Sequence, residues 1–307
     1  MNMETAKRAL VLINPGAGSG EVTGLRAVLE FALVKHGWHY EMALLEKGVH
    51  ISSVVQQLVH AGNTGASLVI ACGGDGTISL VASAIIKAGL ASRLTLGAFP
   101  SGTANSLARD LGVPSDWSAA ADFLCTQSPV VQLDAMKMGE RYCFLRIGVG
   151  LDAATIHETS REDKKHLGRW AYVKSFLSRL FHPQRIRFTC HIDGRRRRFW
   201  AVQLFIANGG NIALVPFRIG PDIKWNDGVL NICAYDALYW WDYLTLGWKL
   251  FRKNYHAHPL LKFYVSTRQI RVQCKPVAMV QADGESFATT PIHIEVIPQA
   301  VQVLSQQ

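Results

Sequence analysis

The sequence has no hydrophobic run long enough to cross a membrane. Hydrophobic residues make up 49% of the 307 residues, yet each apolar stretch falls well short of the roughly 20 residues that a membrane-spanning helix needs. The apolar stretch 9–13 is also too short for the core of a signal peptide, and it runs directly into Asn14 and Pro15. We therefore expect a cytoplasmic protein without a transmembrane segment.

Cysteine is sparse, and acidic residues are fewer than basic ones. The six cysteines stand singly without a Cys-x-x-Cys pair, so the sequence indicates neither a zinc knuckle nor a disulfide framework and favours reduced, buried thiols. Lysine plus arginine number 32 against 23 for aspartate plus glutamate, giving a net charge of +9. This surplus attracts nucleic acid, nucleotide phosphates or an anionic membrane surface. Charge alone does not choose among these partners.

Two common nucleotide-binding signatures are missing. The lysine loop Gly-x-x-x-x-Gly-Lys-Ser/Thr does not occur, which excludes an ordinary P-loop enzyme. Gly16, Gly18 and Gly20 do not reproduce the dinucleotide fingerprint, and Glu46 is a weak candidate for a ribose contact. No motif for nucleic-acid recognition is found either, so we expect no nucleic-acid partner.

Residues 1–126 alternate between short apolar runs and amphipathic stretches. Strands are predicted near residues 9–13, 38–45, 67–72 and 94–99, with helical apolar stripes after each of them. Alternation of this kind is typical of a parallel sheet flanked by helices. The first half therefore predicts a Rossmann-like α/β domain.

Beyond residue 130 the pattern changes to short alternating segments, which predict a mostly antiparallel β domain. Asp193-Gly194 favours the positive φ angles of a tight hairpin turn, so residues 195–198 would open the returning strand. Helical patterns interrupt the strands at 166–181 and 238–255. The other predicted strands are 130–138, 142–149, 186–193, 199–208 and 229–235.

Three polar or glycine-rich loops follow predicted strands in the first half. They are residues 14–20, the Gly-Gly-Asp-Gly-Thr loop 73–77, and the Pro-Ser-Gly-Thr-Ala-Asn loop 100–105. Helix N-termini and backbone N–H groups at such positions can collect phosphates. Glycine permits close approach of a ligand, and threonine supplies a hydroxyl. Three such loops on one sheet edge favour a phosphate-binding function.

These motifs, in this order, resemble the catalytic domain of diacylglycerol kinases. The matching segments are the loops 14–20 and 73–77, the stretch 100–112, the Gly-Val-Gly-Leu-Asp-Ala segment 148–153, the stretch 221–229 and the late Asp283-Gly284-Glu285. The chain is similar to bacterial soluble lipid kinases, to sphingosine kinases and, more distantly, to NAD kinases. The resemblance spans nearly the whole chain.

The resemblance implies an N-terminal, NAD kinase-like nucleotide domain over residues 1–130 and a β-sandwich lipid-substrate domain over 131–294. The last strand, about 295–307, is implied to return to the first domain. ATP is the implied phosphate donor. The implied nucleotide-binding residues are Asn14, Gly73, Gly74, Asp75, Gly76, Thr77, Ile78, Ser79, Gly102, Thr103 and Asn105.

The resemblance also implies the catalytic and metal-binding residues. The family's catalytic base falls on Glu285, and Asp75 and Asp283 complete the catalytic set. Phosphoryl transfer needs positioning, charge compensation and a group that deprotonates the acceptor hydroxyl, and Glu285 would supply the last. A structural or activating Mg²⁺ is implied at Asp227, Lys224 and Val229. We expect Glu285 to fold back across a cleft from the early glycine loops.

Some positions depart from the family pattern. After Gly-Gly-Asp-Gly-Thr the family usually continues to Asn-Glu-Val, where this chain has Ser79, Leu80 and Val81. The usual Asn-Asp of the third motif is Asn105-Ser106 here. Two alternatives to a lipid kinase therefore stay open: a kinase for a soluble acceptor such as NAD, and a catalytically silent regulator that binds nucleotide or lipid.

A lipid acceptor would bring the protein to a membrane. The stretch 238–253 is rich in tryptophan and tyrosine beside cations, and Arg195 to Arg198 add charge, which together favour peripheral contact with an anionic membrane surface. We therefore expect a cytoplasmic protein that docks transiently on the inner membrane face. The acceptor would be diacylglycerol, phosphatidylglycerol or a sphingoid-type lipid, and a homodimer is left open.

Overall fold

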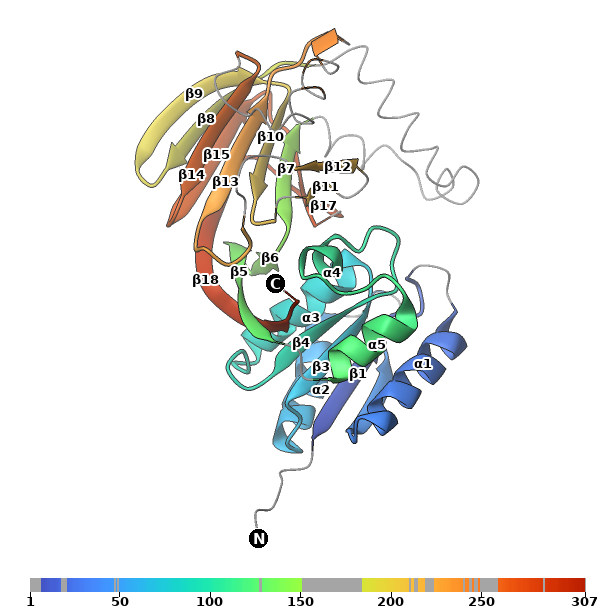
Figure 1. Cartoon of the computed structure of the whole chain (residues 1–307). Coiled ribbons are helices and arrows are strands. Elements are labelled where there is room, and N and C mark those ends of the chain that lie inside the picture. The colour runs from blue at the N-terminus through green and yellow to red at the C-terminus, as the bar shows by residue number, and fades with distance from the viewer. Residues whose placement is uncertain are drawn as a thin grey trace. The chain divides into compact units, whose positions relative to one another are not determined.

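The computed structural model describes residues 7–17, 21–46, 48, 50–126, 129–150, 184–209, 211–212, 215–218, 224–239, 241–242, 245, 248, 259–283 and 285–306. The chain divides into two compact units, Met1–Asp134 with Gln299–Gln307, and Ala135–Pro298. Figure 1 shows both as ribbons. No helix among the described residues combines the length and the apolar character needed to cross a membrane.

The first unit is built on a parallel sheet with the strand order β2-β1-β3-β4. The registers of all three strand pairs are parallel, which confirms the predicted sheet. The central strand β3 is buried along its whole length, while β2 at the edge is partly exposed, as expected for a sheet covered on both faces. The strands are β1 (Arg8–Ile13), β2 (His39–Leu44), β3 (Leu68–Gly73) and β4 (Thr95–Pro100).

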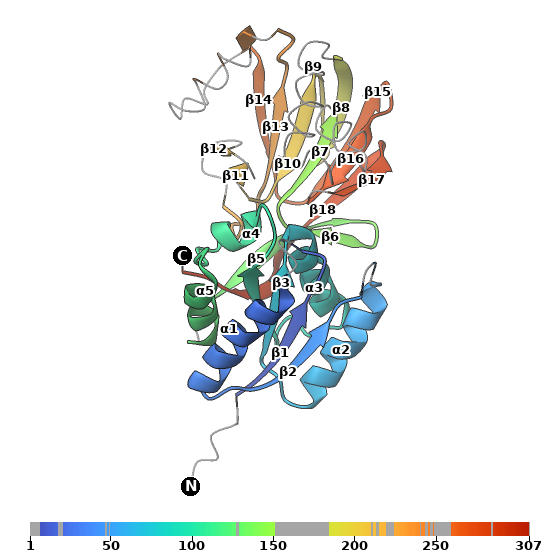
Figure 2. The same ribbon diagram turned by 90° about the vertical axis from the view of Figure 1, so that its right-hand side faces the viewer.

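Helices cover both faces of this sheet. α1 (Val22–Lys35) packs beside α5 (Trp117–Cys125), and α2 (Ile51–Asn63) packs beside α3 (Asp75–Lys87); the two pairs lie on opposite faces (Figure 2). The short α4 (Ser106–Asp110) follows β4. Apolar periodicity predicts one stripe for α1, and all of its residues but Val28 are buried; the stripe is Leu25, Val28, Leu29, Ala32 and Leu33.

The second unit pairs antiparallel strands in two sheets, which confirms the predicted β-sandwich. One sheet has the order β14-β13-β10-β7-β16-β17, and the other runs β18-β15-β8-β9. A small ribbon joins β11 (Asn211–Ile212) and β12 (Val215–Arg218). The other strands are β7 (Arg146–Gly150), β8 (Ile186–Ile192), β9 (Arg195–Ala201), β10 (Gln203–Ala207), β13 (Leu230–Tyr235), β14 (Leu261–Ser266), β15 (Gln269–Lys275), β16 (Met279–Ala282) and β17 (Glu285–Thr289).

The long last strand β18 (Ile292–Leu304) belongs to both units. Residues 292–295 pair antiparallel with β15, whereas Gln302 and Val303 pair in parallel with β4. β5 (Val130–Met138) pairs with β18 and with β6 (Arg141–Cys143). Gln299 has a positive φ of 52°, and its N–H donates to Asp134 Oδ1 at 2.8 Å.

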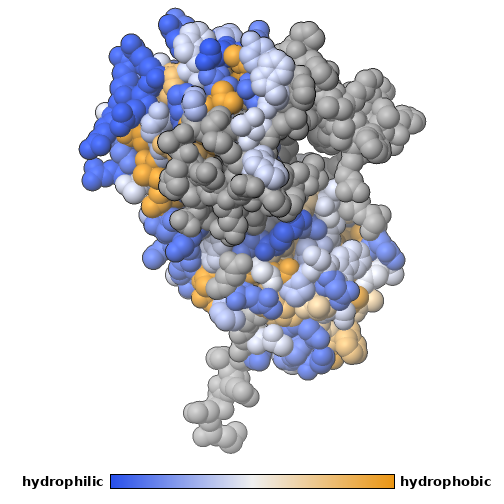
Figure 3. Space-filling model, turned by 45° about the horizontal axis from the view of Figure 1, so that its top comes forward, coloured by the Kyte–Doolittle hydropathy of each residue, from blue (hydrophilic) through white to orange (hydrophobic). Residues whose placement is uncertain are grey.

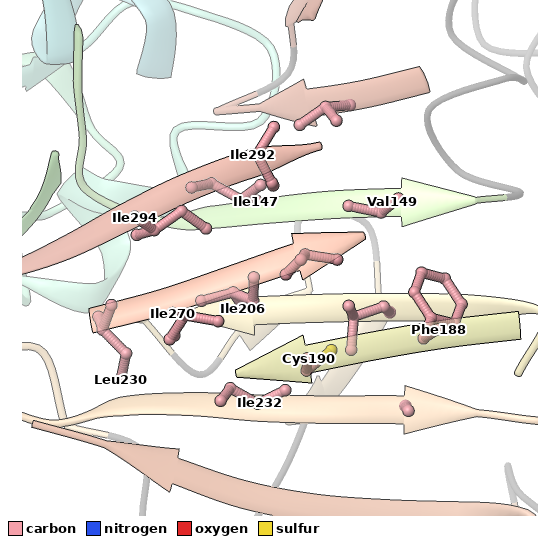
Figure 4. Packing of buried hydrophobic residues seen from close by; sticks show 14 of the residues in the cluster. Ile147, Val149, Phe188, Cys190, Ile206, Leu230, Ile232, Ile270, Ile292 and Ile294 are labelled. Atoms are coloured by element: carbon pink, nitrogen blue, oxygen red, sulfur yellow. The ribbon is translucent and has the colours of Figure 1, made fainter. Parts of the chain in front are cut away.

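The core of the second unit lies between its two sheets. Figure 4 shows Ile147, Ile206 and Ile232 from one sheet meeting Phe188 and Ile270 from the other. All of these side chains are fully buried, so alternate residues of each strand supply the hydrophobic stabilisation of the sandwich.

The six cysteines of the chain are also buried, as the sequence predicted. Burial raises the pKa of the thiols of Cys125 and Cys190 to about 12.

Two predicted strands are each broken in two. The predicted strand 142–149 divides into β6 and β7, because the N–H groups of Phe144 and Leu145 donate to the Asp283 carboxylate. The predicted strand 199–208 divides into β9 and β10 at Val202, where the chain passes from one sheet of the sandwich to the other. The predicted helix 166–181 lies outside the described residues, and of 238–255 only residues 241, 242, 245 and 248 are described as helical.

The predicted hairpin at Asp193 is confirmed. Asp193 and Gly194 both have positive φ, 47° and 84°, and they connect β8 to β9 with Ile192 opposite Arg195. Positive φ at both central residues is typical of a primed two-residue turn. Arg195 therefore opens the returning strand.

Candidate functional site

The order of the parallel strands identifies one edge of the first unit as the place for a ligand. The chain goes from β1 to β2 on one side and then to β3 and β4 on the other side. Open α/β sheets bind ligands at the carboxyl ends of the strands where the order reverses in this way. Asn14 follows β1, Gly74 follows β3, and Ser101 follows β4 at this edge.

The loops after β1 and β3 are joined by a hydrogen bond between side chains. Asn14 Nδ2 donates to Thr77 Oγ1 at 2.8 Å, while Asn14 Oδ1 accepts from the N–H of Gly16 at 2.9 Å. The N–H of Asn14 donates to the carbonyl oxygen of Cys72 in β3. Thr77 is buried, so its hydroxyl is held in place at the first turn of α3.

Asp75 joins the loop after β3 to the loop after β4. Its Oδ1 accepts from the N–H of Leu107 in α4 at 2.9 Å. A backbone N–H group in the first turn of α4 therefore finds its hydrogen-bond acceptor at the start of α3. An asparagine could keep this bond through its own Oδ1, because the amide oxygen is also an acceptor.

The loop after β4 is closed by Asn105. Asn105 has a left-handed backbone with φ 48°, its Oδ1 accepts from the N–H of Gly102, and its Nδ2 donates to the Gly102 carbonyl oxygen, both at 2.9 Å. Thr103 at the loop tip is exposed. The geometry thus fixes the loop through Asn105 and leaves the Thr103 side chain accessible to a ligand.

Two of the glycines in these loops are required by packing. A Cβ on Gly102 would lie 2.3 Å from Gly74 Cα, and a Cβ on Gly73 would lie 2.4 Å from Thr77 Cβ. Gly74 differs, because the nearest atom to a Cβ built there is 3.6 Å away. The loops after β3 and β4 therefore touch through their backbones, and Gly74 keeps space in front of it.

The N-terminus of α3 points its backbone N–H groups at this edge. Its N-cap, Gly74, offers no side chain as an acceptor, which leaves a helix start of the kind that binds phosphates. Ile78 and Ser79 are both buried within α3. The N–H of Ile78 donates to the carbonyl oxygen of Gly74 at 3.1 Å, so this donor already has a partner within the first turn of α3.

A shallow pocket lies beside Asn14 and Ser101. Its volume of about 10 Å³ holds about one water molecule. Its lining is Ile13, Asn14, Ala17, Glu21, Val22, Leu25, Ser101 and Trp117.

Asp283, in the second unit, holds a turn with its carboxylate. Oδ2 accepts from the N–H of Phe144 at 2.9 Å, and Oδ1 accepts from those of Leu145 and Arg146 at 3.0 and 3.2 Å. Asp283 itself has a positive φ of 46°. Glu285 begins β17 opposite Ala282, and its side chain lies outside what the structure describes.

The implied magnesium residues lie on a turn before β13. Asp227 Oδ1 accepts from the N–H of Val229 at 3.0 Å, and both Lys224 and Asp227 are exposed. One carboxylate with backbone carbonyls is an all-oxygen donor set, which fits a hard cation such as Mg²⁺ that keeps several waters. Within the described ranges, no group of three or more His, Cys, Asp and Glu residues is placed to hold a metal.

Sequence reasoning named the residues at the strand ends but missed how they connect. The Asn14–Thr77 bond spans 63 residues and the Asp75–Leu107 bond spans 32. The sequence did contain a signal for these connections, namely a polar side chain directly after β1 and another at the start of α3. Parallel strands bring such residues to one edge.

Comparison with known proteins identifies the family. Residues 8–138 match the diacylglycerol kinase catalytic domain, and residues 146–305 match the YegS C-terminal NAD kinase beta sandwich-like domain. A protein of Synechocystis is 25% identical, with 99% of this chain and 74% of that protein covered. A "Putative lipid kinase" of Staphylococcus haemolyticus is 28% identical over 78% of this chain and 76% of its own length.

Solved structures show the same fold. The crystal structure of a diacylglycerol kinase from Bacillus anthracis superimposes with a TM-score of 0.76 at 23% identity, covering 98% of this chain and 97% of that one. The second matched region alone, residues 146–305, makes up more than half of the chain. The chain therefore belongs to the diacylglycerol kinase family whose catalytic domain is followed by a YegS-type, NAD kinase-like β-sandwich domain.

Proposed function

We propose that this protein is an ATP-dependent lipid kinase that transfers the γ-phosphate to a lipid hydroxyl. The observation that carries the proposal is the linkage of three loops at one sheet edge, through Asn14 to Thr77, Asp75 to Leu107 and Asn105 to Gly102. Kinases of the diacylglycerol kinase family use ATP. The loops supply the preorganised backbone that phosphoryl transfer needs.

In this proposal the triphosphate binds at the start of α3. Its charge meets the N–H groups after Gly74, where a glycine leaves space. The exposed Thr103 contributes a hydroxyl from the neighbouring loop, and Asp75 positions the loop after β4 through Leu107. Asn14 acts as a positioning residue through Thr77.

Glu285 acts as the general base on the acceptor hydroxyl. A well-placed general base raises the rate by roughly 10²–10⁴-fold. Asp283 sits two residues before it and holds the turn 144–146, so in this proposal it positions the hairpin that carries Glu285. The acceptor class is a lipid alcohol such as diacylglycerol, phosphatidylglycerol or a sphingoid base. Similar proteins named as lipid kinases support this choice.

The proposal also includes a structural Mg²⁺ in the second unit. Asp227, with the carbonyl groups of Lys224 and Val229, would hold it on the exposed turn before β13. The ion would supply a fixed positive charge that orders this turn.

The test is transfer of a radiolabelled γ-phosphate from ATP into a total lipid extract, with Mg²⁺ present. Asp75→Asn keeps the acceptor for Leu107 but removes the negative charge that this proposal places beside the ATP phosphates and their Mg²⁺, and Glu285→Gln removes the base. Both should lower transfer at least 100-fold while thermal unfolding is unchanged. Glu30→Gln, on the exposed side of α1, is the matched control and should keep full activity.

The same assay separates the competing functions. Label in NAD with none in lipid would overturn the proposal in favour of a soluble acceptor. Absence of transfer to every lipid class, with ATP still bound, would overturn it in favour of a silent regulator. Full activity in Glu285→Gln would remove Glu285 from the chemistry.

A further inference from the structure

We infer that the outer face of strands β15, β8 and β9 docks on an anionic membrane surface. This basic face consists of Arg187, Arg196, Arg198, Arg271 and Lys275, all exposed. The inference extends the proposed lipid kinase and depends on that function only for the choice of a lipid partner. Figure 3 shows strongly hydrophilic residues gathered over the β8–β9 ribbon at the upper left.

The strand registers place these five side chains on one side of the sheet. Successive residues of a strand alternate between faces, and the alternate set Phe188, Cys190 and Ile192 of β8 is buried in the sandwich core. Arg187 lies opposite Lys275 of β15 and opposite Trp200 of β9. His191 lies between Arg271 and Arg196 in the same way. The five cations therefore share one face of three neighbouring strands, with Arg198, opposite Thr189, between these two rows.

The opposite face of β9 confirms this alternation. Phe199 is buried and stacks on Phe188 with 5.7 Å between the ring centroids. Arg197 shares that face, and its guanidinium lies 5.7 Å from the centroid of the Tyr264 ring. Arg195 and Arg197 thus belong to the other side of the strand. The four consecutive arginines of the sequence contribute only Arg196 and Arg198 to the basic face.

The basic face carries charge without compensation. Among the residues that the structure describes, none of its five cations forms an ion pair. Glu295 of β18 lies 4.0 Å from His293, and the Asp193 carboxylate at the β8–β9 hairpin accepts from the N–H groups of Thr267, Arg268 and Gln269. Like charges directly opposite each other, such as Arg187 and Lys275, destabilise a sheet. A layer of anions placed on this face would relieve that repulsion.

Exposed aromatic rings border one end of the basic face. Trp200 is 48% exposed, and the guanidinium of Arg185 lies 6.0 Å from its ring centroid. Arg185 in turn pairs with Asp236, just before the stacked and exposed rings of Tyr239 and Trp241. Tryptophan and tyrosine beside cations are enriched where proteins meet the lipid headgroup layer. This border favours a membrane over other anionic surfaces.

The test is sedimentation of the full chain with vesicles of pure phosphatidylcholine or of phosphatidylcholine mixed with phosphatidylglycerol. Wild-type protein should bind only the anionic vesicles, and salt should release it. Each cation near an anionic surface adds a similar increment, so Arg196→Gln with Arg198→Gln should weaken binding roughly 10- to 30-fold. Arg271→Gln with Lys275→Gln, from another strand of the same face, should do the same.

Arg8→Gln with Arg26→Gln is the matched control, because it removes two exposed cations from the first unit. This variant should bind vesicles within about twofold of the wild type. Equal losses in control and test variants would overturn the inference in favour of a general effect of net charge. If the variants of the basic face lose binding to a single-stranded oligonucleotide but still bind vesicles like the wild type, the inference is overturned in favour of nucleic acid. Vesicle binding does not require phosphate transfer, so a failed kinase assay leaves this result readable.

Discussion

The two units fix their loops by different means. In the first unit, loops at the carboxyl ends of the strands are held by close backbone packing at Gly102 and by single bonds from Asn14 and Asp75. In the second unit, Asp283 and Asp193 each collect at least three backbone N–H groups on one carboxylate. The first arrangement leaves open space beside the chain for a ligand, whereas the second uses charge for stability.

Removing the Asp283 carboxylate should give the largest loss of stability. Asp283→Ala leaves the N–H groups of Phe144, Leu145 and Arg146 without this acceptor, which should lower the free energy of unfolding by about 3 kcal/mol. Asp283→Asn keeps an acceptor oxygen and tolerates the positive φ, so its loss should be about half as large. Urea unfolding measures both. Equal stability of the alanine variant and the wild type would show that the Asp283 carboxylate does not hold this turn.

The glycine contact in the first unit should give the next largest effect. Gly102→Ala places a Cβ against the backbone of Gly74, and the strain should cost about 2 kcal/mol. Gly74→Ala is the matched change on the other side of the same contact, where a Cβ has 3.6 Å of space. Its stability should stay within about 0.5 kcal/mol of the wild type. If the two variants unfold at the same temperature, backbone packing does not fix these loops.

Acid should weaken the second unit through Asp193. Partial burial pushes the pKa of Asp193 upward, but hydrogen bonds from Gln269, Thr267, Ser266 and Arg268 outweigh it, so the pKa lies below its ordinary value. The stabilisation is therefore complete above the ordinary value of about 3.9 and is lost as the pH falls through the lower folded value. Unfolding curves between about pH 5 and pH 2 should show this loss in the wild type, and Asp193→Asn should flatten it.

The smallest effect should come from a carboxylate on the surface of the first unit. Hydrogen bonds from His36 and Lys35 lower the pKa of Asp122, but this side chain is 42% exposed. Solvent screens such pairs, so Asp122→Asn should leave the unfolding curve unchanged within error. A clear loss would mean that the contact of α1 with α5 depends on charge.

Local patterns predicted most of the elements. The buried strand β3 and the stripe Leu25, Leu29, Ala32 and Leu33 follow directly from apolar periodicity. The hairpin at Asp193-Gly194 follows from the φ angles that this pair favours. These features depend on residues close together in the chain.

Contacts between distant residues account for what the sequence did not predict. The break between β6 and β7 depends on Asp283, which lies 139 residues from Phe144. The bond between Asp75 and Leu107 is of the same kind. Of the basic face, the sequence analysis identified only Arg196 and Arg198, because they belong to the run of four arginines in β9. Alternating cations in β8 and β15, at Arg187, Arg271 and Lys275, were a signal that the sequence did contain.

Titration of ATP into the wild type and into Gly74→Ala tests the central claim most directly. If the triphosphate binds at the start of α3, the added methyl group should weaken ATP binding at least tenfold without lowering the melting temperature, because it occupies space that only a ligand uses. Unchanged affinity in Gly74→Ala, or a wild-type protein that does not bind ATP, would contradict the account.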